Sequence, residues 1–396
     1  MIETPAYVYD LDEVRRAHAL LRGALPQPTR ILYSLKANPH PAIVRTLAGL
    51  GCHAEICSSG ELAVALAAGI PPDRMLYTGP GKRDDDVVEA VKAGVEWFSV
   101  DSPAGLAQVD RIATAADHPV RCLLRVNDQA AVPGQGLTMT GVASQFGADA
   151  DWIVAEPTAF AGVAGFHLYM GSNIDNERAL VAQFGTAIAT ARRLADRLGV
   201  EPLVLDLGGG FGAPFARAGT LPRFDTLAGT IAELLDDGFP GWREGQPVVA
   251  FESGRYLTAT CGTLLTRVLD VKESHGQPVL VLESGINHLG GMSGLRRLPP
   301  IVPDLTGASS EGPSQEDAIV AGPLCTPLDT WARSATVPPV RPGDVLRVPN
   351  VGAYGLTASL LAFLGHPAPH EVVMDGGAVV DVSQLAWVRR ELGPHT

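Results

Sequence analysis

Residues 31–50 read ILYSLKANPHPAIVRTLAGL, an apolar strand-like run that is followed at once by an amphipathic helix. The same alternation continues to about residue 255, and it predicts strands at 31–36, 53–57, 74–78, 96–100, 120–126, 163–169, 203–207 and 248–252. Strands that are apolar throughout and separated by helices indicate parallel pairing. Eight such units predict an α/β protein with a (β/α)8 TIM barrel, with a doubly wound sheet as the alternative.

The pattern changes after residue 255, where strand-like runs are separated by Gly/Pro turns with little helix, as in CGTLLTRVLDVKES (261–274). This pattern predicts a β-barrel or β-sandwich domain. The early run PAYVYD (5–10) is also strand-like and is expected to join it. The predicted domains are a barrel over 26–255 and a β domain made of 1–25 and 256–396. Two polar stretches, 127–150 and 302–317, are expected to be loops.

Composition excludes several classes of protein. The net charge of −13 argues against a nucleic-acid partner. The chain has no run of 18 apolar residues, and its start, MIETPAYVYDLDEV, lacks the features of a secretion signal. Five cysteines without small-domain spacing predict reduced thiols. We therefore expect a cytoplasmic protein with no membrane or nucleic-acid partner, and we predict no metal site.

Chemically active side chains recur where the predicted barrel strands end. Carboxyl ends of barrel strands form the active-site face of such folds. The residues expected to meet there are Lys36, Glu55, Arg125, His167, Tyr169, Ser172, the glycines of LDLGGGFG (205–212), Glu252 and Arg255.

These residue types together point to one cofactor. A lysine between apolar walls has a depressed pKa and can attack a carbonyl, although an isolated lysine at a strand end can equally extend into solvent. A glycine-rich loop offers backbone N–H groups to a phosphate, and Arg255 can bind the same anion. The loop follows the seventh strand rather than the first, so a dinucleotide fingerprint is disfavoured. Glu252 can then hold a protonated ring nitrogen, and the set describes pyridoxal phosphate bound to Lys36.

Seven motifs carry a family resemblance over nearly the whole chain. In order, they are YSLKAN, the acid in HAEICSSGE, HLYMGS, DLGGGFG, ESGR, GPLCTPLD (322–329) and GAYG (352–355). The chain resembles the fold-type III pyridoxal-phosphate decarboxylases, the group of diaminopimelate and ornithine decarboxylases. This resemblance implies a PLP-dependent amino-acid α-decarboxylase, a carboxy-lyase.

The resemblance also implies roles for individual residues. Lys36 would bind the cofactor, with Glu55, Arg125 and Ser172 around it and Glu252 on its pyridine nitrogen. The phosphate would be held by Gly208, Gly209, Gly210, Arg255 and Tyr354. Cys325 would donate the proton, from a loop that also contains Asp329 and reaches the partner subunit's site, so a homodimer is implied. The alternative for Cys325 is a buried core thiol. Tyr169 replaces the family's ring-stacking histidine, and the direction of His167 is left open.

Departures from the family bear on the substrate. Ser284 and Thr326 stand where related enzymes place acids that hold a distal ammonium, so a free diamino acid with a cationic tail is disfavoured. CTPLD, INHL, GAYGLTAS and FLGHPAP resemble a narrower branch that includes the butirosin-pathway aminoacyl carrier-protein decarboxylase. We therefore expect a glutamate- or aspartate-like substrate on an acyl-carrier protein, in antibiotic-type specialised metabolism. Arg296, Arg297 and Arg333 are candidates for docking an acidic carrier, or ordinary solvated arginines.

Three other functions remain possible from the sequence. One is a decarboxylase of a free amino acid, either diaminopimelate-like or a siderophore precursor. A second is an alanine-racemase-like enzyme, which would need a catalytic tyrosine in the β domain and would lack the CTPLD loop. A third is a non-catalytic PLP-binding protein, a class of barrels without a β domain, against which residues 256–396 argue.

Overall fold

The chain folds into two compact units. The computed structural model describes residues 2–128, 137–138, 140–290, 302–307, 312–391 and 393. The barrel unit comprises Val14–Ala213 and Thr220–Thr258, and the β unit comprises Met1–Glu13, Pro214–Gly219 and Ala259–Thr396. These bounds differ from the predicted ones, because most of the first helix belongs to the barrel unit. The Arg22 guanidinium of that helix donates a hydrogen bond of 2.8 Å to the carbonyl oxygen of Thr29, which lies just before the first barrel strand.

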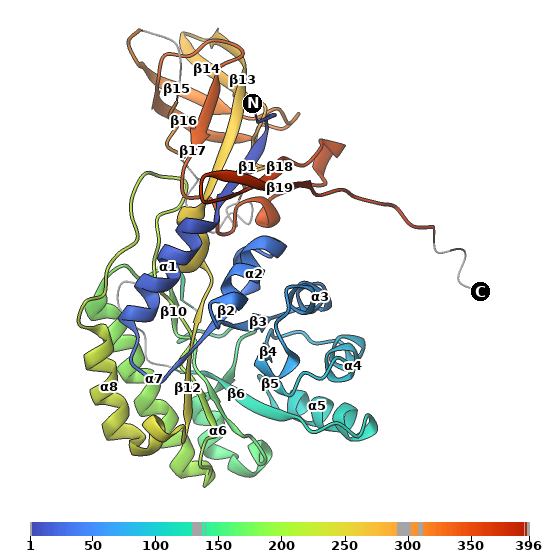
Figure 1. The fold of residues 1–396 in the computed structure, drawn as a ribbon, viewed down its shortest axis with the longest axis vertical. Coiled ribbons are helices and arrows are strands. Elements are labelled where there is room, and N and C mark those ends of the chain that lie inside the picture. Colours follow the sequence, from blue (N-terminus) through green and yellow to red (C-terminus); the bar gives the residue numbers. More distant parts are fainter. Residues whose placement is uncertain are drawn as a thin grey trace. The chain divides into compact units, whose positions relative to one another are not determined.

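Eight parallel strands close the barrel (Figure 1). In order around it, they are β2 (Arg30–Ser34), β3 (His53–Ile56), β4 (Met75–Tyr77), β5 (Trp97–Val100), β6 (Arg121–Asn127), β9 (Gly165–His167), β11 (Val204–Asp206) and β12 (Val248–Ser253). The ring closes where β12 pairs with β2, with Glu252 opposite Leu32. The predicted (β/α)8 barrel is confirmed, and each predicted strand corresponds to an observed one.

Helices surround the barrel strands (Figure 1). They are α1 (Leu11–Ala24), α2 (Pro41–Gly49), α3 (Ser59–Ala67), α4 (Asp84–Lys92), α5 (Pro103–Ala115), α6 (Ala150–Ala155), α7 (Glu177–Leu198), α8 (Leu227–Gly238) and the short α9 (Arg255–Thr258). Local sequence sets several of their starts. Ser58, Ser102 and Asn176 each accept a backbone N–H with their side chain at a helix N-cap. These caps fix where the chain leaves each preceding strand or loop, and therefore where the strand ends lie.

The β unit is one mixed sheet in the order β16-β15-β14-β13-β1-β18-β19, with β17 paired to β13. Its strands are β1 (Ala6–Asp10), β13 (Gly262–Ser274), β14 (Gln277–Leu282), β15 (Gln315–Ala321), β16 (Thr330–Val337), β17 (Val345–Val348), β18 (His370–Asp375) and β19 (Ala378–Gln384). The N-terminal strand β1 pairs antiparallel with β13 and parallel with β18. The expectation that this domain takes the N-terminal strand is confirmed.

The two predicted loops contain some regular structure. The first, 127–150, includes β7 (Leu137–Thr138), which pairs with β10 (Gly171–Ser172), and β8 (Ala148–Asp149), which pairs in parallel with the end of β6. In the second, 302–317, Thr306 forms an isolated bridge with Arg347. All five cysteines are free thiols. Within the described residues, no helix combines the length and the apolar character needed to cross a membrane.

Candidate active site

Lys36 lies just after β2, in a single 3-10 turn (Leu35–Ala37) whose other two residues are buried. Its Nζ is 2.9 and 2.8 Å from Glu55 Oε1 and Oε2. The side chain of Lys36 is 42% exposed, whereas that of Glu55, on β3, is 2% exposed. The prediction of a lysine between apolar walls is therefore wrong, because the ammonium pairs with the buried carboxylate of Glu55.

Glu55 is held by several polar groups. Thr78 donates its hydroxyl to Oε1, and the Cys57 thiol lies 3.2 Å from the same oxygen. Burial alone would raise the pKa of this carboxyl, but the Lys36 charge and the hydrogen bonds lower the pKa below its ordinary value. The opposite effect operates on Cys57, where burial and the nearby Glu55 charge raise the thiol pKa. The Glu55 carboxyl is thus ionised at neutral pH.

The glycine-rich loop follows β11 at the same end of the barrel. A Cβ on Gly209 would lie 2.3 Å from the Glu252 carbonyl oxygen, and Gly210 has a φ of +110°. Glycine is required at both positions, by close approach at one and by backbone conformation at the other. Among the described residues, neither Gly209 nor Gly210 donates its N–H to a protein acceptor. The loop therefore presents two backbone donors of the kind that bind phosphate oxygens.

Tyr169 and His167 occupy different places. The Tyr169 ring lies against the glycine loop, where a Cβ on Gly208 would be 2.9 Å from Tyr169 Cδ2. His167 is 1% exposed and points into the barrel. Its Nδ1 is 2.8 Å from Ser99 Oγ, and its Nε2 is 3.2 Å from Glu252 Oε1. The open question about His167 is resolved: its side chain points inward, toward Glu252.

Asp206 lies beside this pair at the end of β11. Its Oδ1 accepts the Gly208 N–H at 2.9 Å, which ties the acid to the start of the glycine loop. One side-chain oxygen of Asp206, one ring nitrogen of His167 and one side-chain oxygen of Glu252 all lie within 4.8 Å of one another. Within the described residues, Asp206 Oδ2, His167 Nε2 and Glu252 Oε1 make no hydrogen bond of good geometry, although all three atoms are buried.

The remaining predicted barrel residues lie at the same strand ends. Arg125, on β6, is 7% exposed, and its guanidinium carbon is 4.7 Å from the centre of the Phe146 ring. Arg255 is the first residue of α9, two residues after β12 ends. Ser172 is half-buried at the end of β10. The barrel unit alone therefore brings together the predicted lysine, acids, glycine loop and arginines.

Five predicted site residues belong to the β unit: Ser284, Cys325, Thr326, Asp329 and Tyr354. Cys325 is exposed, and Thr326 Oγ1 accepts the Leu328 N–H at 3.3 Å. Tyr354 has a left-handed backbone with φ of +53°. Arg333 is exposed, while Arg296 and Arg297 lie outside the described residues.

The predicted substrate-binding roles of Ser284 and Asp329 are not supported. Ser284 is fully buried, and its Oγ is 3.1 Å from His288 Nδ1. The two Asp329 oxygens accept the N–H groups of Ile286 and Leu324 at 2.8 and 2.7 Å. Asp329 is 2% exposed, so it ties the 324–329 loop to the neighbouring turn and has no oxygen facing solvent. Sequence patterns could not distinguish this structural carboxylate from a substrate ligand.

Three further residues were not singled out from the sequence. Asp206 lies within the quoted motif DLGGGFG, so its place after a strand was the available signal. Ser99 carries no motif and is recognisable only through its contact with His167. Lys82 is a second lysine at this rim, and its Nζ donates to the carbonyl oxygens of Gly79 and Ser99, each at 2.6 Å. Burial lowers the pKa of Lys82.

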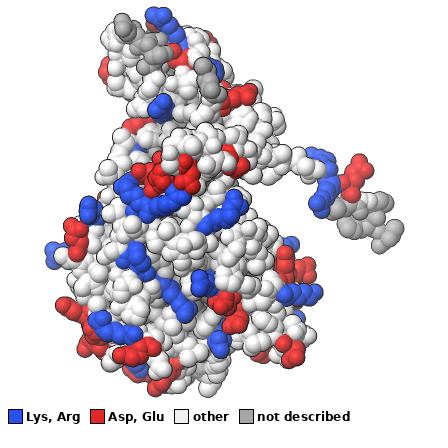
Figure 2. Space-filling view, in the orientation of Figure 1, with Lys and Arg blue, Asp and Glu red and all other residues white. Residues whose placement is uncertain are grey.

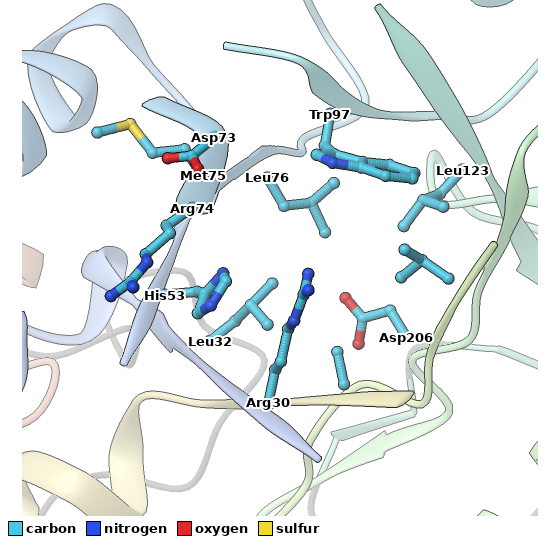
Figure 3. Close-up of a pocket in the computed structure, with 12 residues that line it drawn as sticks. Arg30, Leu32, His53, Asp73, Arg74, Met75, Leu76, Trp97, Leu123 and Asp206 are labelled. Carbon is cyan, nitrogen blue, oxygen red and sulfur yellow. The ribbon is translucent and has the colours of Figure 1, made fainter. Parts of the chain in front are cut away.

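A small pocket lies at the opposite end of the barrel, where the strands begin (Figure 3). Its volume is about 30 Å³, room for about one water molecule. Charged side chains rim it, apolar residues including Leu32 and Leu76 line it, and the Asp206 carboxylate points toward it. This pocket is far too small for an amino-acid substrate, so it is not the substrate site.

The residues present fit pyridoxal phosphate. Two glycine N–H groups are available for a phosphate, and a buried Glu252 oxygen lacks a well-aligned donor. The protonated ring nitrogen is a donor that such a carboxylate would accept. Lys36 supplies the amine, and its side chain is accessible. Residues 11–259 match the family described as "Pyridoxal-dependent decarboxylase, pyridoxal binding domain". The chain belongs to this family.

Comparisons with individual proteins agree. The L-glutamyl-(BtrI acyl-carrier protein) decarboxylase of Niallia circulans is 30% identical over 391 residues, covering 95% of this chain and 90% of the relative. The diaminopimelate decarboxylase of Methanothermobacter thermautotrophicus is 31% identical over 393 residues, covering 95% and 88%. The solved diaminopimelate decarboxylase of Helicobacter pylori, complexed with L-lysine, has the same fold, with a TM-score of 0.81, 24% identity and coverage of 96% and 93%.

Family membership establishes the class of reaction. This pyridoxal-dependent decarboxylase is a carboxy-lyase that uses pyridoxal phosphate. The alanine-racemase-like and non-catalytic alternatives are set aside, because the family and the relatives named above are decarboxylases. The similarity is nearly equal for a relative named for a carrier-bound substrate and one named for a free amino acid, so the substrate is argued separately.

Proposed function

We propose that this pyridoxal-dependent decarboxylase removes the α-carboxylate of a glutamate- or aspartate-like aminoacyl group whose side-chain carboxyl is joined to an acyl-carrier protein. We further propose that it acts as a cytoplasmic homodimer in specialised metabolism, with the loop around Cys325 reaching the partner's site. In this proposal the substrate is a small amino acid that the acyl-carrier protein brings to the enzyme.

The state of Asp329 is the observation that carries the substrate proposal. Relatives that bind a distal ammonium need a free carboxylate near this loop. Within the part of this region that the structure describes, the acids near the loop are Asp329, whose two oxygens accept backbone N–H groups, and Glu283, whose Oε1 accepts the Arg267 N–H at 2.6 Å. A cationic tail would be left without a counter-ion, which is costly once water is excluded. An acylated, uncharged side chain does not meet this difficulty.

Each barrel residue is given a separate task in this proposal. Bound pyridoxal phosphate supplies an electron sink for the carbanion left when CO₂ departs. Lys36 binds the cofactor through Nζ, which Glu55 orients. The N–H groups of Gly209 and Gly210, with Arg255, hold the phosphate, and Gly208 and Tyr354 complete this site. Glu252 would accept a hydrogen bond from the protonated ring nitrogen, and Tyr169 would pack beside the ring.

Proton return completes the reaction. Cys325 is exposed, and in this proposal its thiol protonates the α-carbon after CO₂ has left. Thr326 lies next to it and contributes to the wall of the substrate site, while Asp329 holds the loop in shape. Arg125 and Ser172 line the cofactor site from β6 and β10.

Docking of an acidic carrier needs local positive charge. Arg333 is exposed on β16 and remains a candidate for this contact. On the face drawn in Figure 2, basic and acidic side chains are interspersed, without one large basic field. Carrier recognition would then depend on a few arginines and on the substrate itself.

Mass spectrometry of loaded carrier proteins tests the proposal. Purified enzyme with pyridoxal phosphate is incubated with glutamyl- or aspartyl-carrier protein, and the acyl group is expected to lose the mass of one CO₂. Free glutamate, aspartate and diaminopimelate are tested in parallel, and Lys36→Ala is the inactive control. CO₂ release from free amino acids alone would refute the carrier-bound substrate.

Decarboxylation of a free diaminopimelate-like amino acid is the second candidate. The comparable identity to a diaminopimelate decarboxylase favours it. The same assay separates the two, because this candidate predicts turnover of the free amino acid and no change in the loaded carrier.

A further inference from the structure

His167, Asp206 and Glu252 form a buried cluster at the ends of three adjacent strands, and the tasks described above use only one of them. Their exposures are 1%, 0% and 1%. The strand register accounts for the grouping. His167 pairs with Asp206 across β9 and β11, and Asp206 pairs with Ala250 across β11 and β12. Glu252 follows Ala250 by two residues, so it points to the same face.

Ser99 sets which nitrogen of His167 carries the proton. The Ser99 hydroxyl is 1% exposed and lies 2.8 Å from His167 Nδ1. Among the described residues, no other acceptor for this hydroxyl is within reach. Donation of this hydroxyl to Nδ1 places the ring hydrogen of the neutral tautomer on Nε2. That nitrogen lies 3.2 Å from Glu252 Oε1.

Asp206 is the member of the cluster whose carboxyl pKa is raised. Its Oδ1 accepts the Gly208 N–H, which leaves Oδ2 as the protonation site. Burial first, and then the Glu252 charge, raise the pKa of Asp206 well above its ordinary value. The titratable groups that face it are Glu252 and His167 from adjacent strands and Glu55 across the barrel, with Arg30 and His53 at the rim of the pocket below.

We propose that His167 and Asp206 are positioning residues that hold the Glu252 carboxylate in place for the ring nitrogen, His167 through Nε2, which lies 3.2 Å from Glu252 Oε1, and Asp206 through Oδ2. This inference rests on the proposed contact of Glu252 with the ring nitrogen. A carboxylate has about four lone-pair sites, so two donors leave room for the ring nitrogen.

The first test is made on the apoenzyme and locates the proton. Asp206→Asn keeps an acceptor for Gly208 and adds a permanent amide donor. In the wild type, the unfolded chain loses the Asp206 proton at lower pH than the folded chain, so stability falls as pH rises above about 4. Asp206→Asn lacks this penalty, and its urea midpoint should exceed that of the wild type by an amount that grows from about pH 4 to about pH 8.

Infrared spectroscopy gives an independent readout of the same proton. The wild-type apoenzyme at neutral pH should show the C=O stretch of a buried neutral carboxylic acid that Asp206→Asn lacks. Glu371→Gln is the matched control, because burial raises the pKa of Glu371 to about 7 in the β unit. This variant should change the pH dependence of stability and leave cofactor affinity unchanged.

The second test measures equilibrium affinity for pyridoxal phosphate by titration of the apoenzyme. Loss of a hydrogen bond to a charged group is expected to weaken binding about tenfold in His167→Phe, with a smaller loss in Ser99→Ala. His167→Gln keeps an amide donor and should restore most of the affinity. If His167→Phe does not fold, Ser99→Ala and His167→Gln still give the comparison.

The outcomes separate this inference from the proposed function. Unchanged pH dependence and infrared spectrum in Asp206→Asn, or equal affinity in the wild type, His167→Phe and Ser99→Ala, would overturn it. Glu252→Gln is measured alongside as the reference for the ring contact. If Glu252→Gln binds pyridoxal phosphate as tightly as the wild type, the proposed role of Glu252 fails, whereas the apoenzyme tests still report where the proton resides.

Discussion

Lys36 and Glu55 form an ion pair in which one ammonium covers a buried acid. Nζ lies 2.9 and 2.8 Å from the two carboxylate oxygens, and the lysine side chain is 42% exposed while the acid is 2% exposed. This relationship explains why an apolar strand is followed by a lysine. Strand β3 places an acid at the same barrel end, and its burial requires a cation on the solvent side.

Removal of the lysine should therefore destabilise the apoenzyme. Lys36→Met keeps most of the side-chain volume but leaves Glu55 without its ammonium, and we expect a loss of about 2 kcal/mol, limited by the exposure of the lysine. Urea unfolding at neutral pH measures the effect. The same substitution in a Glu55→Gln background should cost much less, and equal costs in the two backgrounds would contradict a coupled pair.

The glycine loop predicts a contrast between two alanine substitutions. Gly209→Ala would place a Cβ 2.3 Å from the Glu252 carbonyl oxygen, so the loop must shift. We expect a loss of roughly 2–4 kcal/mol and a large loss of pyridoxal phosphate affinity. Gly229→Ala, in helix α8 with no atom within 4 Å of its Cβ position, is the control. It should stabilise the protein by about 0.5–1 kcal/mol. Thermal unfolding and cofactor titration distinguish the two, and similar behaviour of both variants would refute the steric argument.

Stability should also depend on pH through Glu61, at the start of α3. Burial, and then the Glu55 charge, raise the pKa of Glu61 to about 7. The Cys57 N–H donates a hydrogen bond of 2.7 Å to Glu61 Oε2, and this bond acts in the opposite direction. A raised carboxyl pKa means that the folded chain retains a proton that the unfolded chain releases. This contribution to stability is therefore present below about pH 4 and is lost as pH rises toward about 7.

Glu61→Gln keeps the acceptor and removes the titration. We expect this variant to gain about 1–2 kcal/mol relative to the wild type between about pH 4 and pH 8. Urea midpoints across that range measure the gain. A constant difference between the two proteins over the whole range would show that Glu61 is ionised throughout.

Asp329 is predicted to act on turnover through loop shape. In the wild type, both carboxylate oxygens of Asp329 accept backbone N–H groups. Asp329→Asn replaces one of these oxygens with an NH₂ group, so two donors then face each other. We expect a loss of about 1–3 kcal/mol and a fall in kcat, with pyridoxal phosphate affinity unchanged. Asp270→Asn, at an exposed position of β13, is the matched control and should change neither stability nor kcat. A large change in cofactor affinity in Asp329→Asn would contradict the role in loop shape.

Much of the barrel could be predicted because its signals are local. Each strand is a short apolar run, and the helices between them carry caps such as Ser58, Ser102 and Asn176 that the chain specifies within a few residues. The residues at strand ends follow from the parallel geometry, so Lys36, Glu55, the glycine loop and Glu252 were found together. The domain boundary was less accurate, because α1 has no composition that assigns it to either unit.

The sequence alone determined the fold class, the cofactor chemistry and the set of residues at one end of the barrel, because periodicity and strand ends are properties of neighbouring residues. Only the tertiary structure decided how those residues are paired. Glu55 with Lys36, His167 with Ser99 and Glu252, and Asp329 with two backbone amides are contacts between segments far apart in the chain. Whether a buried polar group serves chemistry or structure depends on which partner reaches it, and strand register and loop conformation set that partner.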